Sequence, residues 1–285
     1  MRVSVGDARL FFEVFGQERA FVDGATEERA ALIGLHGGPG LDGSKLRYQL
    51  APLADAAQVV VPDQRGHGRS DGGGQETWNL RTWADDVKSF CDALEIARPV
   101  VLGVSFGGFV AQGYTAAYPE HPSALILIST GPRLGSIDEA VERFRDVGGD
   151  EAAEIVRRDW EAPTEETAAE WRRICGPLLA LRSDPALDRV RAARIETIDV
   201  NVHFMKEEGR SMDLRDRLAA VRCPTLVVAG ERDPLVPPAI AREIVEAIPD
   251  RLARLEVIAA ASHDVLADNP DESYRVLREF LSELA

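Results

Sequence analysis

The stretch PVVLGVSFGG, residues 99–108, combines a run of apolar residues with a serine between two glycines. A continuously apolar run is typical of a parallel strand that helices cover on both faces. The segment from Phe106 to about Tyr118 is typical of a helix that stops before proline. Ser105 therefore lies at a sharp turn between a strand and a helix, where Gly103 and Gly107 leave room for neighbouring chains. This context, together with the positive end of the following helix, predicts Ser105 as a nucleophile.

Apolar runs of the same kind recur along the chain. They lie at 30–35, 58–63, 124–129, 225–230 and 254–259. Helical periodicity separates them, for example after Asn79, which can cap a helix through Trp83 and Leu94. The N-terminal sequence instead predicts a hairpin around Gly6-Asp7. We therefore expect an α/β fold, a mostly parallel sheet flanked by helices with an antiparallel edge.

The strand signal disappears in one long segment of the chain. Between Pro132 and about Leu218, charged helical patterns carry Trp160 and Trp171 instead. Apolar strand patterns resume after this segment. We expect residues 1–132 and 219–285 to form the core and residues 133–218 to form a helical cap inserted into it.

Composition excludes several classes of partner. The chain has 285 residues and a net charge of −15, which disfavours binding to nucleic acid or to an anionic membrane surface. No apolar run approaches the roughly 20 residues that span a bilayer, and no signal peptide is recognisable, so we expect a cytoplasmic protein. The sequence contains three unpaired cysteines, Cys91, Cys175 and Cys223. Their number and spacing predict neither disulfides nor a metal site.

A serine nucleophile requires a histidine base that a carboxylate orients. Of the five histidines, only His263 follows the last strand pattern on a loop, in the chain order Ser, Asp, His. Asp233 follows the preceding strand pattern, and Pro234 would hold its turn rigid. Glu231 and Asp264 compete with Asp233 for the role of the acid. The predicted catalytic residues are Ser105, Asp233 and His263.

The sequence HGGPG, residues 36–40, follows the first of the buried strand patterns. An oxyanion hole needs two backbone N–H groups aimed at one point, one of them from the residue after the nucleophile. Phe106 supplies the first amide. Gly38 is the preferred second donor and Gly37 the next, because a side chain here would obstruct the substrate carbonyl.

These motifs together resemble the α/β-hydrolase superfamily over nearly the whole chain. HGGPG, the later DQRGHGRS (residues 63–70) and the elbow GVSFGG (residues 103–108) resemble the proline iminopeptidase branch. The resemblance implies a serine hydrolase without metal or cofactor, acting on short peptides or amino-acid amides with a free N-terminus. Within DQRGHGRS, an ion pair between Asp63 and Arg65 is expected to hold the loop beneath the active site.

The substrate class depends on the cap. An aminopeptidase needs a carboxylate there to neutralise the substrate ammonium, because an unpaired buried charge is costly. The resemblance implies Glu196 for this role, and Glu161 is a second candidate. The adjacent Trp160 is a candidate for contact with the substrate, or else part of the core of the cap. The alternative substrate is a small neutral ester or lactone, which needs no such carboxylate. Carbon–carbon bond hydrolysis and a non-catalytic binding protein of the same fold are more distant alternatives, whereas a serine nucleophile argues against epoxide hydrolases and dehalogenases.

Overall fold

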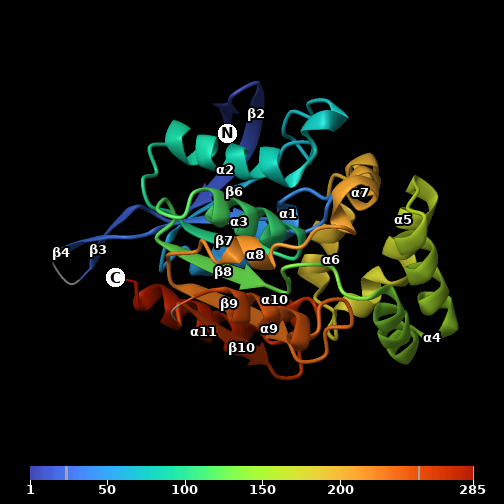
Figure 1. The fold of residues 1–285 in the computed structure, drawn as a ribbon. Helices are drawn as coiled ribbons and strands as arrows, with labels where there is room; N and C mark the ends of the chain where they lie inside the picture. Colours follow the sequence, from blue (N-terminus) through green and yellow to red (C-terminus); the bar gives the residue numbers. More distant parts are fainter. Residues whose placement is uncertain (23–24, 250, 285) are drawn as a thin grey trace.

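In the computed structural model, a sheet of eight strands forms the centre of the protein (Figure 1). The structure describes all residues except 23–24, 250 and 285. Along the sheet the order is β1 (Arg2–Val5), β2 (Ala8–Phe15), β6 (Gln58–Pro62), β5 (Ala31–Leu35), β7 (Val100–Val104), β8 (Ala124–Ile128), β9 (Thr225–Gly230) and β10 (Ala253–Ile258). Neighbours from β6 to β10 pair in parallel, whereas β1 and β2 pair antiparallel at one edge. The predicted fold class, the positions of the six strands and the hairpin at Gly6-Asp7 are confirmed, although β10 is a partly exposed edge strand.

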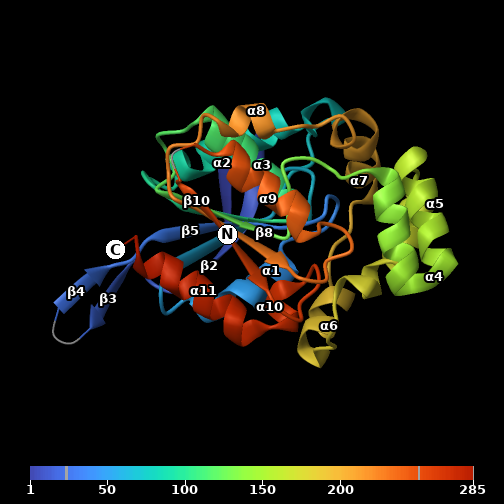
Figure 2. The same cartoon turned by 60° about the horizontal axis from the view of Figure 1, so that its bottom comes forward.

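Helices cover both faces of this sheet (Figure 2). One face packs on α1, α10 and α11, and the other on α2, α3 and α9. Val101 enters one apolar cluster while its neighbours Val100 and Leu102 enter the other, which explains why the strand is apolar at every position. The bounds are α1 (Ser44–Leu50), η1 (Ala51–Leu53), η2 (Gln75–Thr77), α2 (Leu80–Ala93), α3 (Phe106–Ala117), α9 (Pro238–Ala247), α10 (Val265–Asp268) and α11 (Pro270–Ser282).

Between β8 and β9 the chain forms helices, and we call residues 133–218 the helical insertion. Its elements are α4 (Ile137–Glu161), α5 (Glu165–Ile174), η3 (Gly176–Leu179), α6 (Pro185–Ala192), α7 (Ile198–Phe204), η4 (Met205–Gly209) and α8 (Arg215–Leu218). Both figures show α4 and α5 side by side at one end of the molecule, outside the sheet. α7 lies closer to the core, where Phe204 packs edge to face on Phe106 with ring centroids 5.2 Å apart.

Two further features complete the architecture. A second hairpin, β3 (Arg19–Val22) and β4 (Ala25–Glu28), projects from the body and was not predicted from the sequence. None of the helices in the described part of the chain has the length and apolar character needed to span a membrane.

Candidate active site

Ser105 occupies the turn between β7 and α3 in a strained backbone conformation, with φ 52° and ψ −116°. Such positive φ values are rare outside glycine and cluster at functional sites. The turn is tight on both sides. A Cβ atom on Gly107 would lie 2.1 Å from the Leu35 carbonyl oxygen, and one on Gly103 would lie 2.3 Å from the Gly107 oxygen. Both glycines are therefore required by close backbone contact.

His263 and Asp233 meet at the carboxyl ends of β10 and β9. The His263 Nδ1 lies 2.7 Å from Asp233 Oδ2, and the Asp233 side chain is fully buried. The other oxygen of Asp233 accepts hydrogen bonds from the backbone amides of Leu235 (2.8 Å) and Val236 (2.9 Å). These bonds fix the carboxylate, so that its remaining oxygen orients the imidazole and leaves Nε2 available for proton transfer.

The two competing carboxylates lie elsewhere. Glu231 accepts a hydrogen bond from the amide of Ala260. Asp264 points away from the imidazole and accepts bonds from Gln49, Lys45 and Arg191. Burial alone would raise the pKa of Asp264, but Lys45 and its other partners hold that pKa below its usual range. The geometry therefore pairs Asp233, and neither rival, with His263.

Residues 36–40, the glycine loop, pass directly beside Ser105. A Cβ atom on Gly37 would lie 3.4 Å from the Ser105 Cβ, which shows how closely the loop approaches the elbow. Gly38 has φ +135°, a conformation that favours glycine. Among the described residues, none accepts a hydrogen bond from the Gly37 or Gly38 amide. Phe106 begins α3 on the other side of Ser105.

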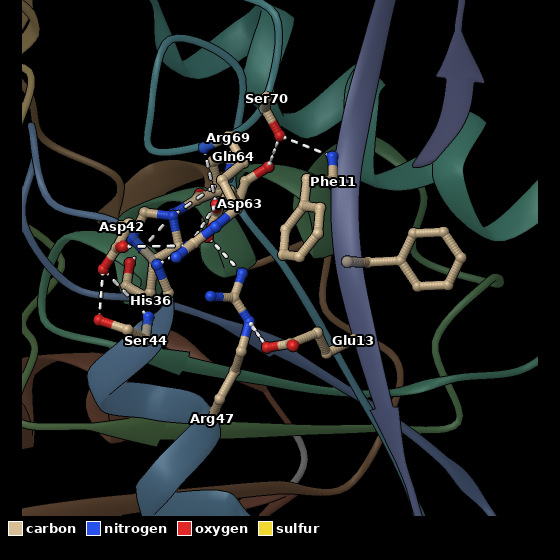
Figure 3. A network of polar contacts seen from close by, with 12 residues as sticks. Phe11, Glu13, His36, Asp42, Ser44, Arg47, Asp63, Gln64, Arg69 and Ser70 are labelled. Atoms are coloured by element: carbon tan, nitrogen blue, oxygen red, sulfur yellow. Dashed lines mark hydrogen bonds and ion pairs between the residues drawn. The ribbon is translucent and has the colours of Figure 1, made fainter. Parts of the chain in front are cut away.

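A buried polar network supports the glycine loop from below (Figure 3). Asp63, fully buried, accepts hydrogen bonds from the Gly43 amide (2.8 Å) and the Arg69 amide (2.8 Å) and pairs with Arg47 of α1. The His36 ring and carbonyl both bond to Gln64. This network ties the loops after β5 and β6 together.

The predicted ion pair between Asp63 and Arg65 is wrong. Arg65 instead makes a bidentate bond to Asp86 of α2, at 2.8 Å and 2.7 Å, and a further bond to Asp7. Arg65 already lies in the turn that follows β6, so strand geometry no longer places it beside Asp63, and the two side chains find partners on different elements. Asp63 and Arg65 still hold the loop after β6. Asp63 does so through Arg47 of α1, and Arg65 through Asp86 of α2.

A cavity of about 490 Å³ lies between the sheet and the helical insertion. Ser105, Phe106, Gly37, Gly38 and His263 all line it. Its walls are largely apolar or aromatic. The residues of this kind include Leu41, Leu46, Phe109, Leu134, Trp160, Trp171, Leu179, Phe204, Met205, Leu235 and Val236. A cavity of this size accommodates a small ligand at the candidate nucleophile.

The three predicted substrate-binding residues have different environments. Trp160 lines the cavity. Glu196 pairs with Arg172 (2.8 Å) and Arg194 (2.6 Å), and Glu161 pairs with Arg157 on an exposed face. Neither glutamate is among the residues that line the cavity.

The structure brings a different carboxylate, Asp159, into the cavity wall. Asp159 is 6% exposed and accepts a hydrogen bond from Thr167 Oγ1 at 2.8 Å. Burial raises the pKa of this carboxyl group. In the sequence it is one of 48 acidic residues and lies between Arg158 and Trp160, where no local pattern marks it as buried.

Within the described residues, no cluster of His, Cys, Asp and Glu has the makeup of a metal site. All three cysteines are buried, and burial raises the pKa of Cys223 to about 11. They are therefore poor nucleophiles at neutral pH.

Comparison with known proteins agrees with this architecture. The chain is 26% identical over 284 residues to a proline iminopeptidase of Pestalotiopsis fici, covering 96% of this chain and 99% of that one. It is 28% identical over 267 residues to a 2-hydroxy-6-oxo-6-phenylhexa-2,4-dienoate hydrolase of Comamonas testosteroni, covering 90% and 89% of the two chains. A thermophilic esterase from Thermogutta terrifontis superimposes with a TM-score of 0.72 at 27% identity, over 100% and 99% of the two chains. The family model for the alpha/beta hydrolase fold matches residues 30–270, and the chain therefore belongs to this family of enzymes.

Proposed function

We propose that the protein is a serine hydrolase that works through an acyl-enzyme. The single observation that carries this proposal is the arrangement at the carboxyl edge of the sheet. There the strained Ser105 and His263 line one cavity, and Asp233 lies 2.7 Å from His263 Nδ1 behind it. A nucleophile, a base and an orienting acid in this order are the groups that acyl transfer needs.

Each group has a defined role in the proposed reaction. Ser105 Oγ attacks the substrate carbonyl while His263 Nε2 accepts its proton and then delivers it to the leaving group. Asp233 holds the imidazole tautomer and stabilises the imidazolium. The amides of Phe106 and Gly38, or Gly37, donate to the oxyanion. Water, activated by His263, then hydrolyses the acyl-enzyme.

For the substrate we propose a short peptide or amino-acid amide with a free amino group. The cavity supports this class because Asp159 offers a buried carboxylate in a largely apolar wall, beside Trp160. A substrate ammonium would supply the positive charge that favours the ionised form of Asp159. Glu196 and Glu161 are committed to arginines and are less suited to the role first assigned to them.

A small neutral ester or lactone is the second candidate, and the largely apolar cavity wall favours it. Such a ligand carries no charge and needs no carboxylate partner in the cavity. The two candidates therefore differ in whether they depend on the charge of Asp159.

The test compares rates on alanine and proline arylamides, acyl esters and lactones. We expect Ser105→Ala to remove nearly all turnover on every active substrate while the protein stays folded by circular dichroism. Substantial turnover by purified Ser105→Ala would exclude the proposed nucleophile. Failure of a fluorophosphonate to label Ser105 in the wild type would favour the non-catalytic binding protein instead.

A matched variant separates the two substrate classes. Asp159→Asn preserves shape and removes the charge, so we expect kcat/KM for free-amine substrates to fall roughly 100-fold, whereas neutral esters change little. Equal losses on both classes would mean that Asp159 is structural. If the wild type hydrolyses esters or lactones but no free-amine substrate, the peptidase proposal fails and the esterase alternative replaces it.

A further inference from the structure

The glycine loop is joined to the helical insertion by backbone pairing. Residues 195–197 of the insertion run antiparallel to residues 40–42, with an isolated bridge between Leu41 and Glu196. The Thr197 amide donates to the Gly40 carbonyl at 2.9 Å, and the Asp42 amide donates to the Ile195 carbonyl at 3.1 Å. Residues that flank the proposed oxyanion donors are thus paired with a segment more than 150 positions later in the sequence.

Asp42 strengthens this junction on both sides. Its Oδ2 accepts a hydrogen bond from the Ile195 amide at 3.1 Å, and its Oδ1 accepts one from the Ser44 amide. Figure 3 shows Asp42 and Ser44 beside His36 and Asp63, in the network beneath the loop. The junction therefore continues into the buried polar network of the core.

Arg172 of α5 reaches across this junction to the glycine loop. Among the described residues of the insertion, it is the one whose side chain donates a hydrogen bond to that loop. Its Nη1 lies 2.8 Å from Glu196 Oε2, and its Nη2 lies 3.4 Å from the Pro39 carbonyl oxygen. The side chain is 12% exposed and lines the cavity. The fit is close, because a Cβ atom on Gly40 would lie 3.0 Å from Nη2 and 2.6 Å from the Thr197 oxygen.

We propose that Arg172 is a positioning residue for the oxyanion hole, holding the glycine loop in register with Ser105 from the helical insertion. Glu196 acts as its counterion and fixes the guanidinium plane. This inference rests on the proposed acyl-enzyme function, because it assigns the loop amides to the oxyanion.

The geometry favours positioning over substrate binding. The guanidinium Nη1 donates a hydrogen bond to Glu196, and Nη2 donates one to the Pro39 carbonyl. Pro39 directly follows Gly38, so a shift of this carbonyl moves the Gly38 peptide as well. Oxyanion donors act only when they lie close to the position where the negative charge develops. A small displacement of the loop would therefore slow the chemical step and leave ground-state binding largely intact.

The experiment compares Arg172→Met, Arg172→Lys and Glu196→Gln with the wild type in the full-length protein. Arg158→Met is the matched control, because it removes another arginine–glutamate pair that involves α5, Arg158–Glu170 at 3.0 Å, and neither of these residues is among those that line the cavity. We measure kcat, KM and the inhibition constant of a trifluoromethyl ketone, which forms an oxyanion adduct with the serine.

We expect Arg172→Met to lower kcat by roughly 10- to 100-fold with KM changed less than about threefold. The inhibition constant of the ketone should rise in parallel. Glu196→Gln should show a smaller loss that is equal on amine and neutral ester substrates, and Arg172→Lys should recover part of kcat. Arg158→Met should resemble the wild type.

Three results would overturn the inference. They are unchanged kcat in a folded Arg172→Met protein, a loss confined to KM, and a loss of kcat without weaker binding of the ketone. If Arg172→Met does not fold, Arg172→Lys and Glu196→Gln still give the same comparison. Full activity of Ser105→Ala would instead disprove the proposed function, which is a separate outcome.

Discussion

At the residue scale, two buried histidines lie close together, His36 at the start of the glycine loop and His67 in the loop after β6. The rings of His36 and His67 are 5.1 Å apart between centroids. The His67 Nδ1 lies 2.8 Å from the Arg65 carbonyl, which accepts a hydrogen bond, so Nδ1 carries the proton of the neutral ring. Burial, and secondarily the neighbouring His36, lowers the pKa of His67 to about 3, and burial also lowers the pKa of His36. Both rings are therefore neutral at neutral pH.

This pair makes stability depend on pH in a defined direction. The pKa of His67 is lower in the folded protein, about 3, than its ordinary value of 6.5, so the unfolded chain binds more protons between these values. Stability must then fall as pH falls from 6.5 towards 3, by up to about 1.4 kcal/mol per pH unit from this residue. His67→Asn can keep the hydrogen bond to the Arg65 carbonyl. We expect its free energy of unfolding to decrease less than that of the wild type between pH 7 and pH 5.

Urea unfolding at each pH measures this slope. The absolute stability of His67→Asn should be lower at pH 7, because the smaller side chain leaves part of the ring's space empty. Only the change in the free energy of unfolding between pH 7 and pH 5 reports on the titration of His67. An identical slope in both proteins would contradict a neutral buried His67.

Individual site residues differ in how far the sequence could predict them. The pairing of His263 with Asp233 was predictable, because chain order and position after a strand pattern restrict the choice strongly. Asp159 was not predictable, because its burial arises from packing between α4 and α5, which no local pattern encodes. Glu196 was assigned by resemblance, and its two arginine partners became visible only in three dimensions.

At the element scale, two of the three glycines of α3 have opposite requirements. Gly107, in its first turn, would place a Cβ atom 2.1 Å from the Leu35 carbonyl oxygen and 2.6 Å from that of His36. Gly113, in the middle of the helix, would place one no closer than 3.9 Å to its neighbours. The same substitution should therefore have opposite effects at the two positions.

We expect Gly107→Ala to destabilise the protein by more than about 3 kcal/mol and to abolish activity, because backbone atoms must move apart at the nucleophile turn. We expect Gly113→Ala to stabilise it by about 0.5–1 kcal/mol with unchanged activity, since alanine favours the helix. Denaturant unfolding and a standard rate assay on both variants check this pair. A stable, active Gly107→Ala protein would mean that the elbow is looser than its geometry indicates.

The elements themselves were predictable to an unequal degree. The buried parallel strands were found because helices on both faces require apolar residues at every position. The hairpin of β3 and β4 was missed because each strand has four residues and their sequences, RAFV and ATEE, carry no shared apolar face. The partner of Asp63 was missed because Arg47 belongs to α1, and the packing of α1 is decided by the whole core.

At the scale of the whole molecule, the helical insertion is attached to the core unevenly. α7 is anchored by Phe204, whose ring packs on Phe106 and Trp83 at centroid distances of 5.2 Å and 5.9 Å. α4 and α5 instead lie at the end of the molecule in both figures and face the cavity through Trp160 and Trp171. α4 packs mainly on α5, and α5 packs mainly on α4, α7 and η3 rather than on the sheet, so both helices are held more weakly.

We therefore expect backbone amides of α4 and α5 to exchange hydrogen through a local opening of lower free energy than those of α7, β7 and β8. Hydrogen–deuterium exchange with mass spectrometry measures this order directly. A bulky phosphonate attached to Ser105 would occupy the cavity and contact the walls that α4 and α5 supply, so it should slow exchange in these two helices most. β7 and β8 should change less, because their amides already open only with the whole fold. The contrary result would be equal opening free energies in all of these elements, with or without the phosphonate. It would show that the insertion and the sheet open as one unit. Substrate would then have to enter without a separate movement of α4 and α5.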